Sequence, residues 1–294
     1  MNKILVTGST GLVGSQLVKD LVENEFKVYS CFHNSQPKYG IPIQMDISKQ
    51  EEIIKVLEEI KPNVIVHLAA FTDVEKCEMQ KDKADLLNTK ATKFLVKESE
   101  KNNVFFVYVS TDYVFDGKKG LRKENDIPNP INHYGKSKLE AEKIIKNSSS
   151  NFLIIRTSTP FGIHSDKKNF PLWVKENLEM KNEIHVVIDQ FTSPTYVPNL
   201  TKMMIDAIKK GITGTINLVG ATRISRFEFA KIIAEKFELD SSLIKPIKIQ
   251  EMKWKAIRPK DSSLDSSKAE KILDKKPKKI THSLDEFQQL LKSI

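Results

Sequence analysis

The feature that most limits what this chain can fold into is a glycine-rich turn near the amino terminus. It reads Gly8-Ser9-Thr10-Gly11-Leu12-Val13-Gly14 and lies between an apolar run at residues 4–6 and a stretch with apolar residues at helical spacing. Glycine allows a tight turn and a close backbone approach to a pyrophosphate, which the N–H groups opening the next helix attract. The pattern predicts a dinucleotide-binding turn, with contacts from Gly8, Thr10, Gly11, Leu12, Val13 and Gly14.

The first half of the chain alternates apolar, strand-like runs with helical patterns. Strands are expected at residues 26–29, 64–68, 104–109 and 152–155, and helices at residues 53–60, 86–99 and 134–145. Strands that are apolar along their whole length and separated by helices are typical of a parallel sheet with helices on both faces. The sequence therefore predicts an α/β fold built on a Rossmann-type doubly wound parallel sheet.

The pattern loosens after about residue 157, where prolines and glycines interrupt it more often. We expect a Rossmann domain at residues 1–157, to which residues 190–219 return. Residues 158–189 and 220–294 would form a smaller α+β substrate-binding portion. Because ligands of α/β sheets bind at the carboxyl ends of the strands, this portion would close over that edge.

The composition indicates a globular protein of an aqueous, reducing compartment. Of 294 residues, 39% are hydrophobic and only two are cysteines, too few for a disulfide framework. No apolar run reaches the ~20 residues of a membrane span, and no secretory signal is recognisable. The net charge of +9 comes mainly from lysines interspersed with acids, which does not favour nucleic acid as a partner. We expect a cytoplasmic protein without a membrane partner and compatible with a homodimer.

The second predicted strand indicates which dinucleotide binds. An Asp or Glu at its end usually holds the ribose 2′-OH of NAD, but no acid occurs between Val28 and Met45. Lys38 lies nearby, and three polar side chains end the strand and could contact a 2′-phosphate: His33, Asn34 and Ser35. We therefore favour NADPH and leave NADH open. Asp46, followed by Ile47, could hydrogen-bond the adenine amine.

A possible catalytic pair is Tyr134 and Lys138. This spacing arises easily by chance in a lysine-rich chain, so the context carries the argument. Residues four apart share one helix face, and Thr111 ends a buried strand at the edge where ligand sites lie. A lysine ammonium favours the phenolate of a neighbouring tyrosine, so we expect Lys138 to lower the pKa of Tyr134 toward the working pH.

With these motifs in place, the chain resembles the extended short-chain dehydrogenases, and within them the dTDP-4-dehydrorhamnose reductases. Nearly the whole chain takes part. The stretches that carry the resemblance are residues 69–78, Ser110-Thr111-Asp112-Tyr113-Val114-Phe115-Asp116-Gly117, residues 134–138, Arg156-Thr157-Ser158, residues 189–195 and Arg258-Pro259. Related dehydratases carry Glu where this chain has Tyr113, which argues against water elimination.

The resemblance implies a reductase of a nucleotide-linked 4-keto-6-deoxy sugar. Thr111 would bind the keto oxygen, Tyr134 would donate a proton, and Lys138 would hold the nicotinamide ribose. Leu68, Ala69, Ala70 and Val109 would line the cofactor channel, with Tyr134 and Lys138. The substrate contacts would come from Thr111, Asp112, Phe161, Asn169 and Arg258. The superfamily often has a helix-bending Asn where Asn88 lies, and no metal ligands can be mapped.

One departure from the family pattern concerns the substrate. The family usually reads Arg-Thr-Ser-Trp-Val-Tyr-Gly, whereas this chain has Thr159 at the tryptophan position, with Phe161 as a candidate to compensate. Two alternatives therefore stay open. One is a non-catalytic NADP-binding regulatory subunit, similar to the beta subunit of methionine adenosyltransferase, and the other is an epimerase or reductase acting on UDP or GDP sugars.

Overall fold

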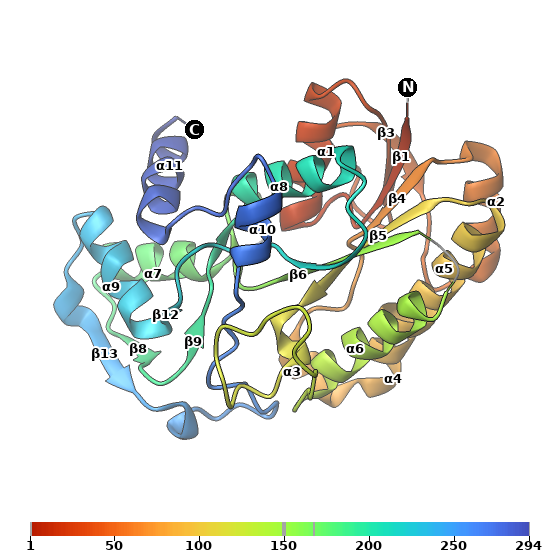
Figure 1. The fold of residues 1–294 in the computed structure, drawn as a ribbon. Coiled ribbons are helices and arrows are strands. Elements are labelled where there is room, and N and C mark those ends of the chain that lie inside the picture. Colours follow the sequence, from red (N-terminus) through yellow and green to blue (C-terminus); the bar gives the residue numbers. More distant parts are fainter. Residues whose placement is uncertain (1, 149–150, 167, 294) are drawn as a thin grey trace.

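Seven parallel strands form the main sheet of the computed structural model, which describes residues 2–148, 151–166 and 168–293 (Figure 1). The order across this sheet is β11-β6-β5-β4-β1-β2-β3. The strands are β1 (Lys3–Thr7), β2 (Lys27–Phe32), β3 (Ile41–Gln44), β4 (Val64–His67), β5 (Phe105–Thr111), β6 (Phe152–Thr157) and β11 (Gly214–Asn217). Strand order reverses between β1 and β4, where doubly wound sheets bind dinucleotides. The predicted fold class is confirmed.

Helices cover both faces of this sheet. Buried residues of α1 (Leu12–Glu23), α8 (Val197–Lys209) and α10 (Ser267–Ile272) form one core cluster with the strands. Residues of α2 (Gln50–Ile60), α5 (Ala91–Lys101) and α6 (His133–Lys146) form a second cluster, with different strand side chains. Alternate strand residues point to opposite faces, which is why Ile4 belongs to the first cluster and Leu5 to the second.

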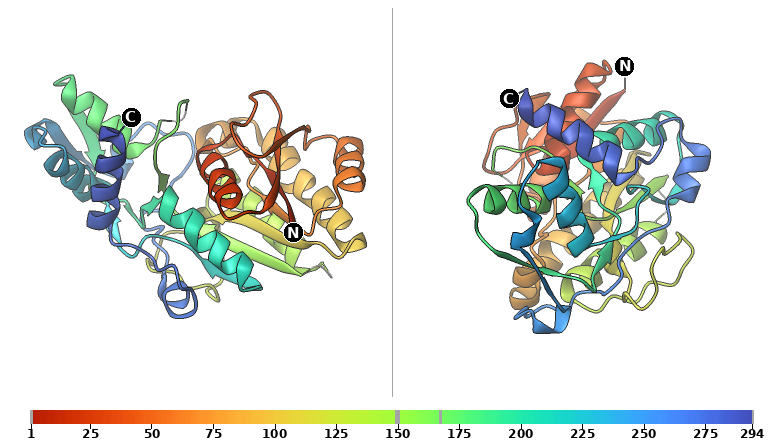
Figure 2. Two further views of the ribbon diagram at one scale, coloured as in Figure 1. Left: turned by 90° about the horizontal axis from the view of Figure 1, so that it is seen from above. Right: turned by 90° about the vertical axis from the view of Figure 1, so that its left-hand side faces the viewer.

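A second lobe has a core of its own and lies beside the sheet (Figures 1 and 2). Its elements are α7 (Phe170–Glu179), β8 (Ile184–Val187), α9 (Arg226–Lys236), β13 (Ile244–Ile247) and α11 (Ile280–Lys292). Strands β8 and β13 pair in parallel. Ser225 and Glu228 form a capping box that fixes the start of α9.

The remaining elements are short. They are α3 (Val74–Met79), α4 (Lys81–Ala84), a π-helix η1 (Asp85–Lys90), η2 (Asp112–Val114), β7 (Pro160–Phe161), β9 (Phe191–Thr192), β10 (Thr195–Tyr196), β12 (Ile224–Ser225), η3 (Ser241–Leu243) and η4 (Ile249–Glu251). Strand β10 pairs with β7 in parallel, and β12 pairs with β9 in the antiparallel direction.

The two lobes do not divide the sequence quite where we expected. Ala269 and Leu273 pack with α1 and α8 against the main sheet, although the prediction assigned residues 220–294 to the smaller portion. The remaining boundaries stay a prediction.

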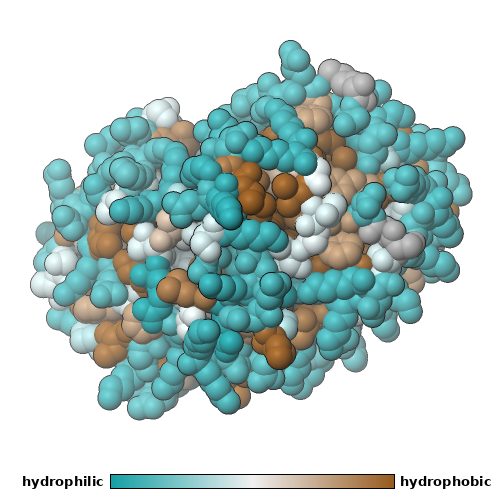
Figure 3. All heavy atoms as spheres, in the orientation of Figure 1, coloured by the Kyte–Doolittle hydropathy of each residue, from teal (hydrophilic) through white to brown (hydrophobic). Residues whose placement is uncertain are grey.

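The surface in Figure 3 is mostly hydrophilic, with hydrophobic side chains in small separate groups. Of the helices in the described ranges, none is both long and apolar enough to span a bilayer.

Candidate active site

The glycine turn between β1 and α1 has no room for side chains. A Cβ at Gly8 would lie 2.6 Å from the Ala69 nitrogen, and one at Gly14 would lie 2.1 Å from the Gly8 oxygen. Gly8 also has a φ of +69°, which a larger residue adopts only with strain. Within the described residues, no side chain caps α1 and no acid lies in its first turn. The amino end of α1 is therefore open to an anion, and it fits a pyrophosphate.

The segment after β4 lies against this turn. The Ala69 nitrogen donates to Thr7 Oγ1 at 3.3 Å, and Thr7 Oγ1 also contacts His67 Nδ1 at 2.7 Å. His67 Nε2 lies 3.1 Å from Thr92 Oγ1, so both ring nitrogens have partners. Burial, aided by the charge of Lys138, lowers the pKa of His67 to about 3. His67 is a neutral core residue that supports residues 68–70.

At the end of β2, His33, Asn34 and Ser35 are exposed, as a ligand-contacting set would be. His33 Nε2 lies 3.9 Å from the Asp46 carboxylate, so the two predicted cofactor segments meet. Hydrogen bonds from Ser48 lower the pKa of Asp46. This leaves Asp46 ionised and able to accept a hydrogen bond, beside Ile47.

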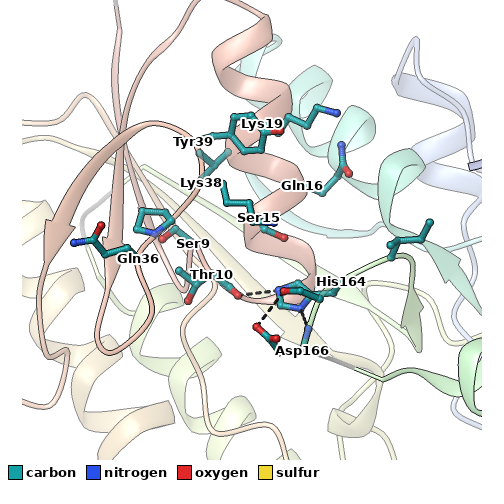
Figure 4. Close-up of a pocket in the computed structure, with 14 residues that line it drawn as sticks. Ser9, Thr10, Ser15, Gln16, Lys19, Gln36, Lys38, Tyr39, His164 and Asp166 are labelled. Carbon is teal, nitrogen blue, oxygen red and sulfur yellow. Dashed lines mark hydrogen bonds between the residues drawn. The ribbon is translucent and has the colours of Figure 1, made fainter. Parts of the chain in front are cut away.

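A cavity of about 320 Å³ adjoins the glycine turn (Figure 4). Ser9 and Thr10 form its floor, Lys19 projects from α1, and Lys38 comes from the loop after β2. Two lysines beside the turn suit a phosphate at the 2′ position of the adenosine ribose. Lys19 lies one helical turn after Ser15 on the cavity-lining face of α1; we did not predict its role, although helical spacing could have indicated it.

Helix α6 holds both members of the predicted catalytic pair. Asn132 caps this helix by accepting a hydrogen bond from the Gly135 nitrogen at 2.9 Å. Lys138 Nζ donates to the Val109 oxygen at 2.8 Å and lies 4.0 Å from the centre of the Tyr108 ring. Because Val109 and Thr111 belong to β5, the capped helix places Tyr134 and Lys138 at the carboxyl edge of the sheet.

The electrostatics of this pair differ from our expectation. Burial raises the pKa of Tyr134 well above its ordinary value, and hydrogen bonding with Thr111 only partly opposes this. Burial also lowers the pKa of Lys138 to about 7, against the attraction of Glu142. The expected lowering of the Tyr134 pKa by Lys138 is therefore wrong in this structure, because loss of hydration dominates. Tyr134 is a protonated phenol at neutral pH, which is the form that donates a proton.

The π-helix η1 is centred on Asn88, the residue expected to bend its helix. Its amide donates to Ser137 Oγ at 3.0 Å and to the Phe71 oxygen at 3.1 Å, and its Oδ1 accepts from the Phe71 nitrogen at 2.7 Å. Ser137 Oγ in turn donates to the main-chain carbonyl oxygen of Tyr134 at 2.9 Å. Buried Asn88 thus ties the segment after β4 to the helix that carries Tyr134.

A second cavity, of about 460 Å³, lies between the lobes. It extends from Leu12 at the start of α1 to Asn169 at the start of α7 and to Arg258. Two polar atoms of these residues are buried without a hydrogen-bond partner among the described residues: Asn169 Oδ1 and Arg258 Nε. Buried polar groups are nearly always paired, and both atoms are closed to solvent, so a ligand in the cavity would reach them only after these side chains shift.

Phe161 does not line this cavity, and the expectation that it contacts substrate is wrong. Its side chain is fully buried in the core of the second lobe and packs against Tyr196, Phe229 and Phe287. Strand β7 points this ring inward. The aromatic residues that do line the cavity are Phe170, Trp173 and Trp254, which sequence reasoning missed.

Thr159 has an unusual backbone conformation, and Asp112 is a buried carboxyl group. Thr159 lines the cavity between the lobes with a φ of +42°, strained for a β-branched residue, and its hydroxyl lies 2.6 Å from Thr192 Oγ1. Asp112 is buried and accepts hydrogen bonds from Thr111 at 2.9 Å and Ser158 at 2.7 Å. Burial raises the pKa of Asp112. A direct sugar contact from Asp112 stays a prediction, whereas its hold on Thr111 is observed.

In the ranges that the structure describes, His, Cys, Asp and Glu side chains form no group of three or more that could hold a metal ion. No metal is therefore assigned to the site.

The open amino end of α1, the Tyr134–Lys138 pair beside Thr111 and the cavity between the lobes together define a dinucleotide-dependent oxidoreductase of the extended short-chain dehydrogenase class. The RmlD substrate binding domain family matches residues 1–293. The chain belongs to that family.

Individual relatives have different activities. The chain is 30% identical over 307 residues to dTDP-4-dehydrorhamnose reductase of Aggregatibacter actinomycetemcomitans, covering 100% of this chain and 98% of the relative. It is also 30% identical to methionine adenosyltransferase 2 subunit beta of Rattus norvegicus, covering 92% and 82%. Among solved structures, dTDP-4-dehydrorhamnose reductase from Bacillus anthracis in complex with NADP has a TM-score of 0.89 at 30% identity, covering 98% and 99%.

Proposed function

We propose that this protein uses NADPH to reduce the 4-keto group of a dTDP-linked 4-keto-6-deoxy sugar. The observation that carries the proposal is the meeting of α6 and β5, where Lys138 binds the Val109 oxygen at 2.8 Å and Tyr134 contacts Thr111. The Bacillus anthracis and Aggregatibacter relatives, both dTDP-4-dehydrorhamnose reductases, support the substrate class.

The cofactor would lie along the carboxyl edge of β1, β2 and β4. Its pyrophosphate would meet Gly11, Leu12 and Val13 at the open end of α1. Its adenine would lie near Asp46 and Ile47, and a 2′-phosphate would lie within reach of Lys38 in the adjoining cavity. When bound there, NADPH supplies the hydride of the reaction.

The chain's own residues supply the proton and its control. Thr111 Oγ1 donates to Asp112 at 2.9 Å, and rotation of this O–H alone redirects it to a keto oxygen. Tyr134, protonated because of its raised pKa, donates its proton to that oxygen as the alcohol forms. Lys138 hydrogen-bonds the nicotinamide ribose and, in its charged form, stabilises the phenolate left behind.

The nucleotide sugar would occupy the 460 Å³ cavity. Asn169 is the N-cap of α7 and its side chain does not cap the helix. Pro171 in the first turn has no N–H, so the N–H groups of this end come from Phe170 and Leu172. Such an end attracts a diphosphate. Arg258, whose side chain lines this cavity and is 21% exposed, would provide the second anion contact.

The test is loss of NADPH absorbance on adding freshly prepared dTDP-4-keto-6-deoxy sugar. Wild-type protein should consume NADPH, and Tyr134→Phe should lower kcat by about 10²- to 10⁴-fold, the usual contribution of a general acid. Tyr29→Phe, at a half-buried tyrosine on β2 that lines neither cavity, is the matched control. Absence of turnover with dTDP, UDP and GDP sugars alike would rule out the reductase.

A regulatory subunit is the second and weaker candidate, because the methionine adenosyltransferase relative is also 30% identical, over a smaller part of both chains than the reductase. This candidate expects tight NADP binding, no turnover and a stable complex with a catalytic partner chain. A homodimer and a cytoplasmic location complete the main proposal. Light scattering of the purified protein and localisation in fractionated cells test them.

A further inference from the structure

We propose that Trp254 is a positioning residue that sets the orientation of Arg258 for the diphosphate of the substrate, an inference that rests on the proposed function. The chain contains two tryptophans, and both line the 460 Å³ cavity. Neither lies at position 159, where the family has its tryptophan. The substrate site therefore draws its large aromatic side chains from other segments.

Arg258 and Trp254 are in direct contact. The Arg258 guanidinium lies 4.3 Å from the centre of the Trp254 ring. A cation over the face of tryptophan is attracted by the ring quadrupole, and the attraction grows when water is excluded. The Arg258 side chain is only 21% exposed, so the stack is largely shielded.

Arg258 also forms an ion pair with Glu75. Glu75, on α3 of the sheet domain, accepts from Arg258 Nη2 at 3.2 Å, and its other oxygen accepts from the Lys255 nitrogen at 2.8 Å. Asn132, the cap of α6, donates to the Ile257 oxygen at 2.9 Å. The segment that carries Trp254 and Arg258 is thereby fastened to α3 and to the start of the helix that carries Tyr134.

These contacts fix the plane of the guanidinium while part of the side chain faces the cavity. Glu75 binds one end of the guanidinium and Trp254 covers a face, and the 21% of the side chain that stays exposed belongs to the lining of the 460 Å³ cavity. An Arg with a fixed plane presents its remaining N–H groups in a fixed direction. Without Trp254 the guanidinium would be free to turn about its stem, and its exposed N–H groups would no longer be held toward a phosphate oxygen in the cavity.

The contact between Trp254 and Arg258 also bears on where the substrate binds. Trp254 and Arg258 also line a neighbouring cavity of about 700 Å³, so their stack separates two spaces. Holding the guanidinium in place keeps the diphosphate on the side of Asn169 and α7.

The experiment compares Trp254→Ala, Trp254→Phe and the exposed-neighbour control Lys253→Ala. We expect Trp254→Ala to raise the KM for the keto sugar and the Kd for TDP by about 3- to 30-fold, with kcat within about twofold of wild type. Trp254→Phe should recover most of this, because a phenyl face also attracts a cation. Lys253→Ala should match wild type, and the NADPH affinity should not change in any variant.

Thymidine, which lacks phosphates, separates a positioning role from a direct contact. The affinity for thymidine should be the same in wild type and Trp254→Ala. An equal loss for thymidine and TDP would mean that the ring contacts the base, and it would overturn the proposal, as would an unchanged TDP affinity or a loss that Trp254→Phe does not recover.

The measurements of TDP binding do not depend on turnover. In Trp173→Phe, Trp254 is the single tryptophan, and its fluorescence should change on adding TDP but not inorganic phosphate at the same concentration. If wild type consumes no NADPH but TDP binds with the expected Trp254 dependence, the proposed reaction fails and the inference stands. If TDP does not bind wild type, the inference fails.

Discussion

His164 Nε2 donates a hydrogen bond to the Thr10 carbonyl oxygen across 3.0 Å, and so joins the loop before α7 to the glycine turn (Figure 4). A carbonyl only accepts, so Nε2 carries the proton. The other ring nitrogen, Nδ1, accepts from the Asp166 nitrogen at 3.0 Å. His164 is thus a neutral tautomer fixed at both ends. It couples the second lobe to the turn that meets the cofactor.

Replacing this histidine should weaken cofactor binding without abolishing catalysis. His164→Ala removes one hydrogen bond that steadies residues 8–11, so we expect the Kd for NADPH to rise by roughly 3- to 10-fold. The kcat at saturating NADPH should stay close to wild type. Isothermal calorimetry measures the first and steady-state kinetics the second. His282→Ala, at an exposed position on α11, is the control, and an unchanged NADPH affinity in His164→Ala would refute the coupling.

The parts of this molecule that sequence reasoning anticipated are those set by local patterns. Gly14 is required by contacts within the turn between β1 and α1, and Tyr134 and Lys138 share one helix face whatever else surrounds them. Alternating buried strands and amphipathic helices likewise determine the doubly wound sheet. Their consequences could be predicted because they depend on neighbours close in the chain.

The substrate side depends instead on contacts between distant segments. Whether Phe161 faces a ligand or a core is decided by Phe229 and Phe287, far along the chain. Trp254 and Glu75 both contact Arg258, although they come from different lobes. The shift of the Tyr134 pKa has the same origin, because burial is a property of the assembled fold. A local pattern carries no signal for any of these.

Lys38 should determine the preference for NADPH over NADH. It lines the cavity beside Ser9 and Thr10, and no acid occurs between Val28 and Met45 to repel a phosphate; Asp166 is the acid in the cavity lining. Lys38→Gln should lower the ratio of kcat/KM for NADPH to that for NADH by roughly 3- to 10-fold, since an exposed charge pair contributes modestly. The NADH value is an internal control that should not move, and Lys55→Gln on α2 is the matched surface variant. A ratio that stays at the wild-type value would place the 2′-phosphate elsewhere.

Lys138 should link stability to pH with a sign opposite to that of a typical surface lysine. Its pKa is 10.5 when solvated and about 7 when folded, because burial disfavours the ammonium. The folded state therefore binds this proton less tightly than the unfolded state. The cost is fully present below about pH 7, shrinks as pH rises and vanishes above about pH 10.5.

The test of this linkage is Lys138→Met. Met cannot be charged, so the difference in Tm between Lys138→Met and wild type should be more positive at about pH 6 than at about pH 10. Lys136→Met, exposed on the same helix, should show no such trend. Lys138→Met should also lose most turnover. A difference that does not depend on pH would mean that Lys138 stays hydrated and charged in the folded protein.

Breaking the buried pair behind Lys138 should strongly destabilise the fold. Arg156 Nε and Nη2 donate to the two Glu142 oxygens at 2.9 Å and 2.7 Å, and both side chains are at most 1% exposed. Burial alone would raise the pKa of Glu142, but the Arg156 contacts outweigh it and hold that pKa below its ordinary value. Glu142→Ala leaves a buried guanidinium unpaired and should cost about 3–5 kcal/mol of unfolding free energy. The double variant Glu142→Leu with Arg156→Met removes both charges and should recover much of that loss in urea titrations. If the double variant were less stable than Glu142→Ala alone, the unpaired charge would not be the cause.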